Sequence, residues 1–177
     1  MSNSRPAKLK VVVVDDEAPA RSELRYLLEK TGKVLVVGEA ATGPEATQLT
    51  LALRPEALFL DIKMPGQDGL GVAETVLANG GQPPLIVFAT AFDSYALRAF
   101  DVSAVDYILK PFQEDRVVQT VDRLLTLRAS LRQVELAANL QTFLETVKED
   151  QELTRVPVDI NGRILLLPIT DICFAYY

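Results

Sequence analysis

Histidine is absent from this 177-residue chain, and cysteine occurs once, at Cys173. The lack of histidine excludes His-based catalytic triads, histidine metal ligands and a phosphohistidine carrier within the chain. A single cysteine allows neither an intramolecular disulfide nor a multi-cysteine zinc site, and we expect Cys173 to be a small buried hydrophobic residue. Any chemistry in this chain must therefore use carboxylates, hydroxyls, lysine or a hard metal ion.

Long apolar runs and dense basic runs are also missing. No apolar run approaches the roughly 18–20 residues that cross a bilayer, and residues 1–10 lack the apolar core of a signal peptide, so we expect a cytoplasmic protein that does not bind membranes. The net charge is −6. Because nucleic-acid binding depends on clustered lysine and arginine, we expect this chain alone to bind DNA poorly.

Short runs rich in Val, Leu, Ile and Phe predict five β-strands, at residues 9–14, 33–38, 57–60, 84–89 and 104–109. Helical patterns alternate with them, at residues 19–30, 43–54, 70–81 and 94–100. Nearly continuous apolar strands alternating with helices predict a parallel sheet covered on both faces, which is a doubly wound α/β fold. Ligands of such folds bind outside the carboxyl ends of the strands.

The pattern changes after Pro111. Residues 113–150 contain no glycine or proline and predict one helix of about 38 residues, with Val117, Val121 and Leu124 packed on the sheet. Farther along, apolar residues keep a broken heptad spacing. This spacing leaves two alternatives open: a helix that dimerises, or one that packs on its own domain or forms a disordered linker.

The last segment, residues 155–177, has a different character. Asn161–Gly162 lies between two apolar runs, which predicts a β-hairpin. A segment of this length cannot build an independent core. We therefore expect it to be the incomplete start of a larger second domain.

Polar residues stand at the carboxyl ends of four predicted strands: Asp15, Asp16 and Glu17, then Asp61, Thr90 and Lys110. Neighbouring carboxylates repel one another unless a cation neutralises them, and oxygen ligands favour Mg²⁺. Acid, metal, lysine and hydroxyl together suit phosphoryl transfer to a carboxylate nucleophile. Each residue alone also has an ordinary explanation, since Asp16 and Glu17 could cap a helix and the others could simply end strands.

Four segments carry a resemblance to a known family: VVVVDDE (11–17), LFLDIKMPGQDG (58–69), FATAF (88–92) and VDYILKPF (105–112). In order and spacing they resemble the receiver domains of bacterial two-component response regulators, over about residues 8–125. The stretch ATAFDSYALRAFDVSAVDYILKPF is similar to the LytR/AlgR branch, and residues 155–177 resemble the opening of its LytTR DNA-binding domain. The resemblance implies a flavodoxin-like receiver with strand order 2-1-3-4-5.

The resemblance also implies roles for residues at the metal and phosphoryl site. Asp61 matches the phosphoacceptor. Asp16 matches a direct Mg²⁺ ligand, Asp15 a ligand through water, and the backbone carbonyl of Lys63 the remaining protein ligand. Lys110 matches the lysine that pairs with the phosphoryl oxygens, and in this family the bond that follows it, to Pro111, is cis.

Two further residues match the family's conformational switch, Thr90 as the hydroxyl and Tyr107 as the aromatic side chain. The implied protein is a response regulator that a sensor histidine kinase phosphorylates, and that dimerises through the 93–125 face, the 113–150 helix or both. It would be a signalling switch whose only catalysis is its own phosphorylation and dephosphorylation. DNA binding and transcription regulation would need the full output domain.

The implied domain organisation has four parts: a disordered tail (1–7), the receiver (8–125), a helical linker or dimerisation helix (126–153), and the start of a LytTR-type β-domain (154–177). An alternative function is a receiver-like interaction module that is never phosphorylated. Mg²⁺ binding separates the two, because a purely structural pocket has no reason to bind the ion.

Overall fold

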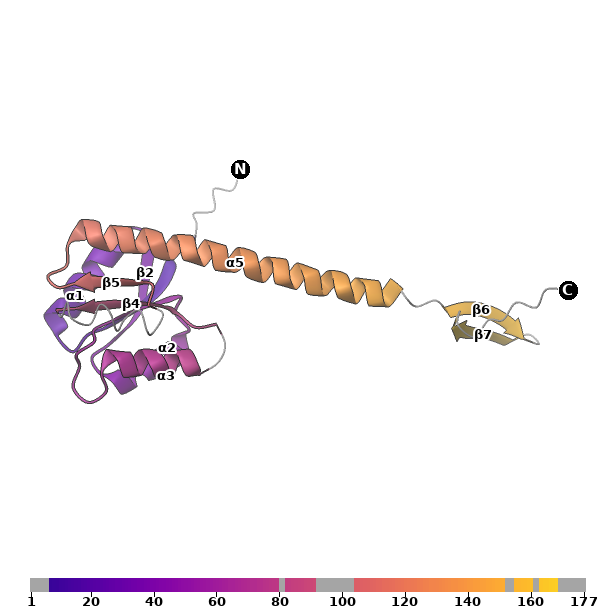
Figure 1. Cartoon of the computed structure of the whole chain (residues 1–177), viewed down its shortest axis with the longest axis horizontal. Helices are drawn as coiled ribbons and strands as arrows, with labels where there is room; N and C mark the ends of the chain where they lie inside the picture. Colours follow the sequence, from indigo (N-terminus) through magenta and orange to yellow (C-terminus); the bar gives the residue numbers. More distant parts are fainter. Residues whose placement is uncertain (1–6, 80–81, 92–103, 152–154, 161–162, 169–177) are drawn as a thin grey trace. The chain divides into compact units, whose positions relative to one another are not determined.

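Five parallel strands form the sheet: β1 (Leu9–Val14), β2 (Val34–Ala40), β3 (Ala57–Leu60), β4 (Leu85–Thr90) and β5 (Asp106–Leu109). Their order is β2-β1-β3-β4-β5, and Figure 1 shows the sheet between its helices. This computed structural model describes residues 7–79, 82–91, 104–151, 155–160 and 163–168, with the backbone alone from residue 143 onward. The order confirms the doubly wound, flavodoxin-like fold predicted from the sequence.

Both faces of the sheet are buried, which explains why its strands are apolar almost throughout. Alternate side chains of a strand point to opposite faces. Val11, Val13 and Phe59 therefore belong to one core cluster, whereas Val12 and Leu58 belong to the other. All five side chains are fully buried.

The helices divide between these two faces (Figure 1). The cluster that contains Phe59 also holds side chains of α1 (Ala18–Lys30) and of the first turns of α5 (Glu114–Gln151). The cluster that contains Leu58 holds side chains of α2 (Gly43–Leu53) and α3 (Gly69–Ala78). Right-handed crossovers between parallel strands require this covering on both sides.

The long helix predicted for residues 113–150 is confirmed as α5, which has 38 residues. Val117, Val121 and Leu124 are fully buried against the sheet, as expected. Farther along the helix, large apolar side chains are exposed: Leu127, Leu131, Val134, Leu136 and Leu140. No helix that the structure describes is both long enough and apolar enough to cross a membrane.

The chain separates into two compact units, residues 1–129 and residues 130–177. In the second unit, β6 (Arg155–Ile160) and β7 (Arg163–Pro168) pair antiparallel, with Ile160 opposite Arg163. This pairing agrees with the predicted hairpin. The turn at 161–162, the helix predicted at 94–100, and Cys173 lie outside the described residues.

Element ends differ from the sequence-based bounds by a few residues. β2 continues to Ala40, β4 includes Thr90, β5 begins at Asp106, and α3 ends at Ala78. At the first step of β5 the Asp106 carboxylate accepts a hydrogen bond from the Tyr107 amide (2.9 Å). Hydropathy does not register such a local side-chain contact.

Candidate functional site

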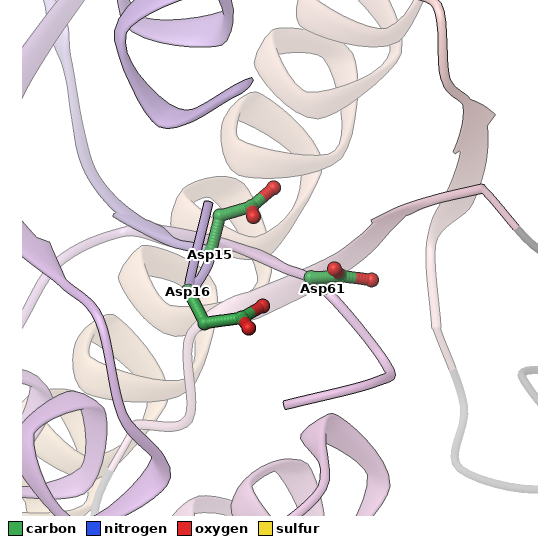
Figure 2. A group of neighbouring side chains, drawn as sticks. All are labelled: Asp15, Asp16 and Asp61. Atoms are coloured by element: carbon green, nitrogen blue, oxygen red, sulfur yellow. The ribbon is translucent and has the colours of Figure 1, made fainter. Parts of the chain in front are cut away.

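Three carboxylates meet at the carboxyl edge of the sheet. Asp15 follows β1 and Asp61 follows β3, and these strands are neighbours. The Asp61 amide donates to the Val14 carbonyl (2.9 Å), which places the two aspartates at the same level. One carboxylate oxygen each from Asp15, Asp16 and Asp61 lies within 4.8 Å of the others, and Figure 2 shows the three side chains around one space.

Lys110 directly follows β5 and brings one positive charge to this group. Its Nζ lies 2.8 Å from Asp15 Oδ2 and 3.1 Å from Asp61 Oδ2. Its Nζ also lies 3.1 Å from Glu17 Oε2. We call these residues the acidic pocket: Asp15, Asp16, Glu17, Asp61 and Lys110.

The pocket holds four carboxylates and one ammonium, so its charge is unbalanced. Burial raises the pKa of the Asp15 carboxyl, and the hydrogen bond from Lys110 only partly offsets this effect. Burial alone would lower the pKa of Lys110, but hydrogen bonds to Asp15 and Glu17 and the charge of Asp61 raise it overall. The lysine is therefore a fixed cation.

The donor set fits a hard divalent cation. Asp15 and Asp61 are nearly inaccessible to solvent, whereas Asp16 is exposed, so the group is open on one side. Clustered carboxylate oxygens are the ligands that Mg²⁺ prefers, and a second cation would relieve the repulsion that Lys110 alone does not neutralise. Asp16, Asp15 and Asp61 are the side chains that would hold it. The Lys63 carbonyl stays a prediction.

Thr90 is the last residue of β4 and is completely buried. Its carbonyl accepts a hydrogen bond from the Lys110 amide (2.9 Å), which ties it to the pocket. Its hydroxyl oxygen has no hydrogen-bond partner among the described residues. Buried polar atoms usually have a hydrogen-bond partner in folded proteins, and the buried hydroxyls of Thr47 and Thr50 likewise have none among the described residues.

The loop after Asp61 is held by the start of α3. The Gly69 amide donates to the Ile62 carbonyl (2.8 Å), and Asp68 caps the helix by accepting from the Gly71 amide (2.8 Å). A Cβ atom at position 69 would lie 2.1 Å from the Asp61 carbonyl oxygen. Only glycine allows the helix to approach the Asp61 backbone so closely.

Glu17 does not cap helix α1 with its side chain. This residue occupies the N-cap position of α1, but its side chain makes no capping hydrogen bond with the described amides of that helix. Its carboxylate contacts Lys110 instead. From the sequence alone, Glu17 is only a candidate helix cap, and the signal for its place in the pocket is its position directly after the aspartate pair.

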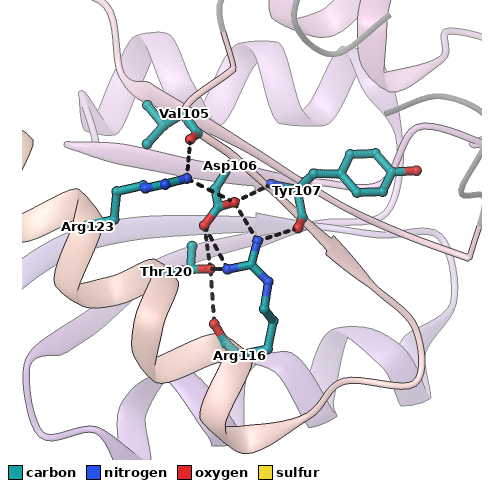
Figure 3. Close-up of polar contacts among 6 residues, drawn as sticks. All are labelled: Val105, Asp106, Tyr107, Arg116, Thr120 and Arg123. Carbon is teal, nitrogen blue, oxygen red and sulfur yellow. Dashed lines mark hydrogen bonds and ion pairs between the residues drawn. The ribbon is translucent and has the colours of Figure 1, made fainter. Parts of the chain in front are cut away.

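A second charged cluster, which sequence reasoning missed, joins β5 to α5; we call Asp106, Arg116, Thr120 and Arg123 the Asp106 cluster (Figure 3). Arg116 Nη2 donates to Asp106 Oδ1 (2.5 Å) and to the Tyr107 carbonyl (2.9 Å). The Thr120 hydroxyl donates to Asp106 Oδ2 (2.8 Å). These contacts hold the backbone of Tyr107, whose side chain points away from the cluster and packs with the α2 and α3 core.

The structure therefore brings the side chains of Asp15, Asp16, Asp61 and Lys110 together. Thr90 is connected to them through the hydrogen bond from the Lys110 amide to its carbonyl. The bond between Lys110 and Pro111 is cis, as the resemblance implied. Lys63 is connected to the site through its amide, which donates to Asp61 Oδ1 (3.4 Å).

Known proteins with similar sequences are regulatory proteins. The chain is 43% identical over 167 residues to the sensory transduction protein LytT of Bacillus cereus, covering 94% of this chain and 65% of the relative. It is 39% identical to the transcriptional regulatory protein BtsR of Escherichia coli, with the same two coverages. The chain thus spans about two thirds of the length of these relatives.

Solved structures agree with this likeness. The response regulatory domain of protein mrkE from Klebsiella pneumoniae superposes with a TM-score of 0.62 at 35% identity, covering 67% of this chain and 97% of that one. The REC domain of AraT, a response regulator from Geobacillus stearothermophilus, superposes with a TM-score of 0.63 at 31% identity, covering 73% and 99%. The family model described as the response regulator receiver domain matches residues 11–122. With this match, these relatives and the observed fold, the chain belongs to the response regulators, and its first unit is a receiver domain.

Proposed function

We propose that this protein is a phosphorylation-controlled switch of the cytoplasm in which Asp61 accepts a phosphoryl group from a sensor histidine kinase. The observation that carries the proposal is the convergence of Asp15, Asp16, Asp61 and Lys110 at one edge of the sheet. The buried Thr90 hydroxyl, which has no partner among the described residues, supports it. Family membership supports phosphorylation-based signalling in general.

The proposed reaction transfers one phosphoryl group between two nucleophiles. A carboxylate oxygen of Asp61 attacks phosphorus, the bond from phosphorus to the donor nitrogen breaks, and the kinase histidine leaves with the electron pair. A bound Mg²⁺ supplies positive charge for the phosphoryl oxygens. Lys110 pairs with a phosphoryl oxygen, because its ammonium already contacts Asp61 and stays protonated. Attack of water on phosphorus later releases phosphate and restores the carboxylate.

The switch in this proposal uses two residues near the pocket. The Thr90 hydroxyl donates to a phosphoryl oxygen and gains the partner it lacks among the described residues. Its shift opens space on the side of β4 and β5 where Tyr107 packs, so the tyrosine moves inward. The altered 93–125 face, of which residues 93–103 lie outside the described part, and α5 then favour a homodimer. A transcriptional output through a DNA-binding domain follows from that assembly.

The first experiment measures the intact mass of the protein after incubation with acetyl phosphate and Mg²⁺. We expect a gain of one phosphoryl group in the wild type and no gain in Asp61→Asn. Asp122→Asn is the matched control, because Asp122 is an exposed aspartate that pairs with Lys33 away from the pocket. Equal labelling of the wild type and Asp61→Asn would refute Asp61 as the acceptor, and a wild type that gains no mass would favour an interaction module without phosphorylation.

A second experiment measures assembly by sedimentation velocity with and without beryllofluoride, a phosphoryl mimic that binds the acceptor aspartate. We expect the mimic to shift the wild type from monomer toward dimer and to leave Asp61→Asn unchanged. A wild type whose sedimentation does not respond to the mimic would contradict the link from phosphorylation to assembly. The mass experiment would still stand, because labelling does not depend on dimerisation.

A further inference from the structure

Arg21 lies on α1, outside the acidic pocket, yet it contacts the backbone of a pocket residue. Its Nη1 donates to the Asp15 carbonyl oxygen at 2.6 Å, and its side chain is mostly buried. The contact joins residues only six positions apart, at the end of β1 and in the first turn of α1. The guanidinium therefore touches the turn that carries Asp15, Asp16 and Glu17.

The Asp15 carbonyl lies just beyond the last residue of β1. The amide of the same residue donates to the Ala40 carbonyl (3.1 Å) on the neighbouring strand, and its carboxylate accepts from the Glu17 amide (3.0 Å). Arg21 satisfies the remaining polar group of this backbone position. A carbonyl at the buried end of a strand needs a donor, and a guanidinium supplies a strong, oriented one.

The guanidinium is itself held in place. Arg21 Nε pairs with Glu39 Oε2 at 3.4 Å, and Glu39 Oε1 also accepts from Arg25 Nη1 at 2.5 Å. Glu39 belongs to β2, so the side chain of Arg21 spans the end of β1, the start of α1 and β2. An anchored donor of this kind restricts the turn more than a freely rotating one would.

We propose that Arg21 is a positioning residue for the metal-binding acidic pair. It fixes the 15–17 turn so that the carboxylates of Asp15 and Asp16 stay aimed at one point beside Asp61. This inference rests on the proposed function, since it assigns to Arg21 the geometry of the proposed Mg²⁺ site. Without Arg21 the carboxylates are still present, but the cation must order them when it binds, and that ordering reduces its affinity.

The sign of the effect separates positioning from simple electrostatics. Removing a positive charge next to an acidic cluster should tighten the binding of a cation. Removing a positioning contact should weaken it. Arg25 provides the matched control, because it shares Glu39 with Arg21 and pairs with Glu29, while its side chain is 47% exposed.

The experiment compares the wild type, Arg21→Gln, Arg21→Lys and Arg25→Gln by isothermal titration with Mg²⁺ alone, at a temperature where circular dichroism shows every variant folded. We expect about tenfold weaker binding for Arg21→Gln, as the loss of one charge-assisted hydrogen bond implies, and about threefold weaker binding for Arg21→Lys, which keeps one donor group. Arg25→Gln should stay within about twofold of the wild type.

A kinetic readout complements the titration. In Arg21→Gln the Mg²⁺ concentration that gives half-maximal labelling by acetyl phosphate should rise, while the rate at saturating Mg²⁺ stays near that of the wild type. Unchanged or tighter Mg²⁺ binding in Arg21→Gln overturns the proposal, and so does an equal loss in Arg25→Gln. If Arg21→Gln does not fold, Arg21→Lys with wild-type affinity overturns it. A wild type that binds no Mg²⁺ would instead refute the proposed function.

Discussion

The acidic pocket and the Asp106 cluster both place buried aspartates beside cationic side chains, but the balance of charge is opposite. In the pocket, four carboxylates share Lys110. In the cluster, two arginines and a threonine share the single carboxylate of Asp106. Burial raises the pKa of Asp15, whereas for Asp106 the hydrogen bonds from Arg116, Tyr107 and Thr120 outweigh burial and lower its pKa.

This difference separates a site that needs a further cation from a contact that is already complete. Both aspartates have little solvent exposure, so burial alone does not distinguish them. The two aspartates differ in the number of hydrogen-bond donors that contact each carboxylate. We therefore expect the pocket to contribute little to stability in the absence of a metal ion, and the Asp106 cluster to contribute much.

The largest expected effect is on stability, in Asp106→Ala. The free energy of unfolding should fall by about 3 kcal/mol, because the Thr120 hydroxyl and two guanidinium groups lose their shared acceptor. Urea denaturation followed by circular dichroism measures it. Asp122→Ala, which breaks the exposed pair with Lys33, is the control and should cost under about 0.5 kcal/mol. Equal losses in the two variants would show that the Asp106 cluster stabilises the fold no more than an exposed ion pair does.

The second expected effect lies in the pocket, in Asp16→Asn. Affinity for Mg²⁺ should fall at least about tenfold, or ~1.4 kcal/mol, because an exposed, charged ligand of the proposed site is lost. Without Mg²⁺ the variant should melt no lower than the wild type, since one repelling charge has been removed. Titration calorimetry and thermal melts measure the two quantities, with the exposed Glu23→Gln on α1 as the control. A melting temperature well below that of the wild type would show that Asp16 is structural.

The third effect appears only in acid. Because the folded-state pKa of Asp106 is lowered, its contacts stabilise the fold above the unfolded-state pKa of about 3.9, and this contribution is lost as the pH falls through the folded-state value. The difference in unfolding free energy between the wild type and Asp106→Asn should be constant above about pH 5 and shrink below it. Urea titrations at several pH values measure this difference. A difference that grows as the pH falls would contradict a lowered folded-state pKa of Asp106.

The smallest effect is expected within the Asp106 cluster itself, for Arg123→Ala. Arg123 Nη1 lies 3.5 Å from Asp106 Oδ1, and the Arg123 side chain is 59% exposed. Losing this ion pair should therefore lower the free energy of unfolding by under about 0.5 kcal/mol. Arg116→Ala should cost more, because Arg116 makes two close contacts with Asp106 and one with the Tyr107 carbonyl. Urea denaturation of both variants gives the comparison, and a larger loss in Arg123→Ala would contradict it.

Strand and helix placement was predictable because burial on both faces leaves a strong apolar signal in β1, β3 and β4. The pocket was predictable for a topological reason, since parallel strands bring their carboxyl ends to one edge. The closing contact from Arg21 was not predictable, because it depends on the rotamer of one long side chain. Glu17 and Lys110, which are 93 positions apart, were expected at the same edge of the sheet, but the sequence does not say that they contact each other.

The Asp106 cluster has a weak signal in the amino-acid sequence of α5. Arg116, Thr120 and Arg123 recur at the spacing of one helix face, directly beside the buried face formed by Val117, Val121 and Leu124. Thr120 is itself fully buried, which is unusual for a polar residue on an otherwise amphipathic helix. The buried Thr120 and the neighbouring Arg116 both contact the carboxylate of Asp106, which opens the edge strand β5.

The tight contact at Gly69 has a practical meaning for protein engineering. A backbone hydrogen bond from the Gly69 amide to the Ile62 carbonyl closes the loop after Asp61. Both ends of the segment 63–68 are therefore fixed. Within it, Gly66 has a φ of 85° and Asp68 caps α3, so these two positions should be kept. The proposed ligand at Lys63 is a main-chain oxygen, which any amino acid provides. Substitutions at the exposed Lys63 and Pro65 should therefore leave the acceptor aspartate where it is, whereas Gln67 is partly buried, packs close to Gly43 and donates to the Thr75 hydroxyl.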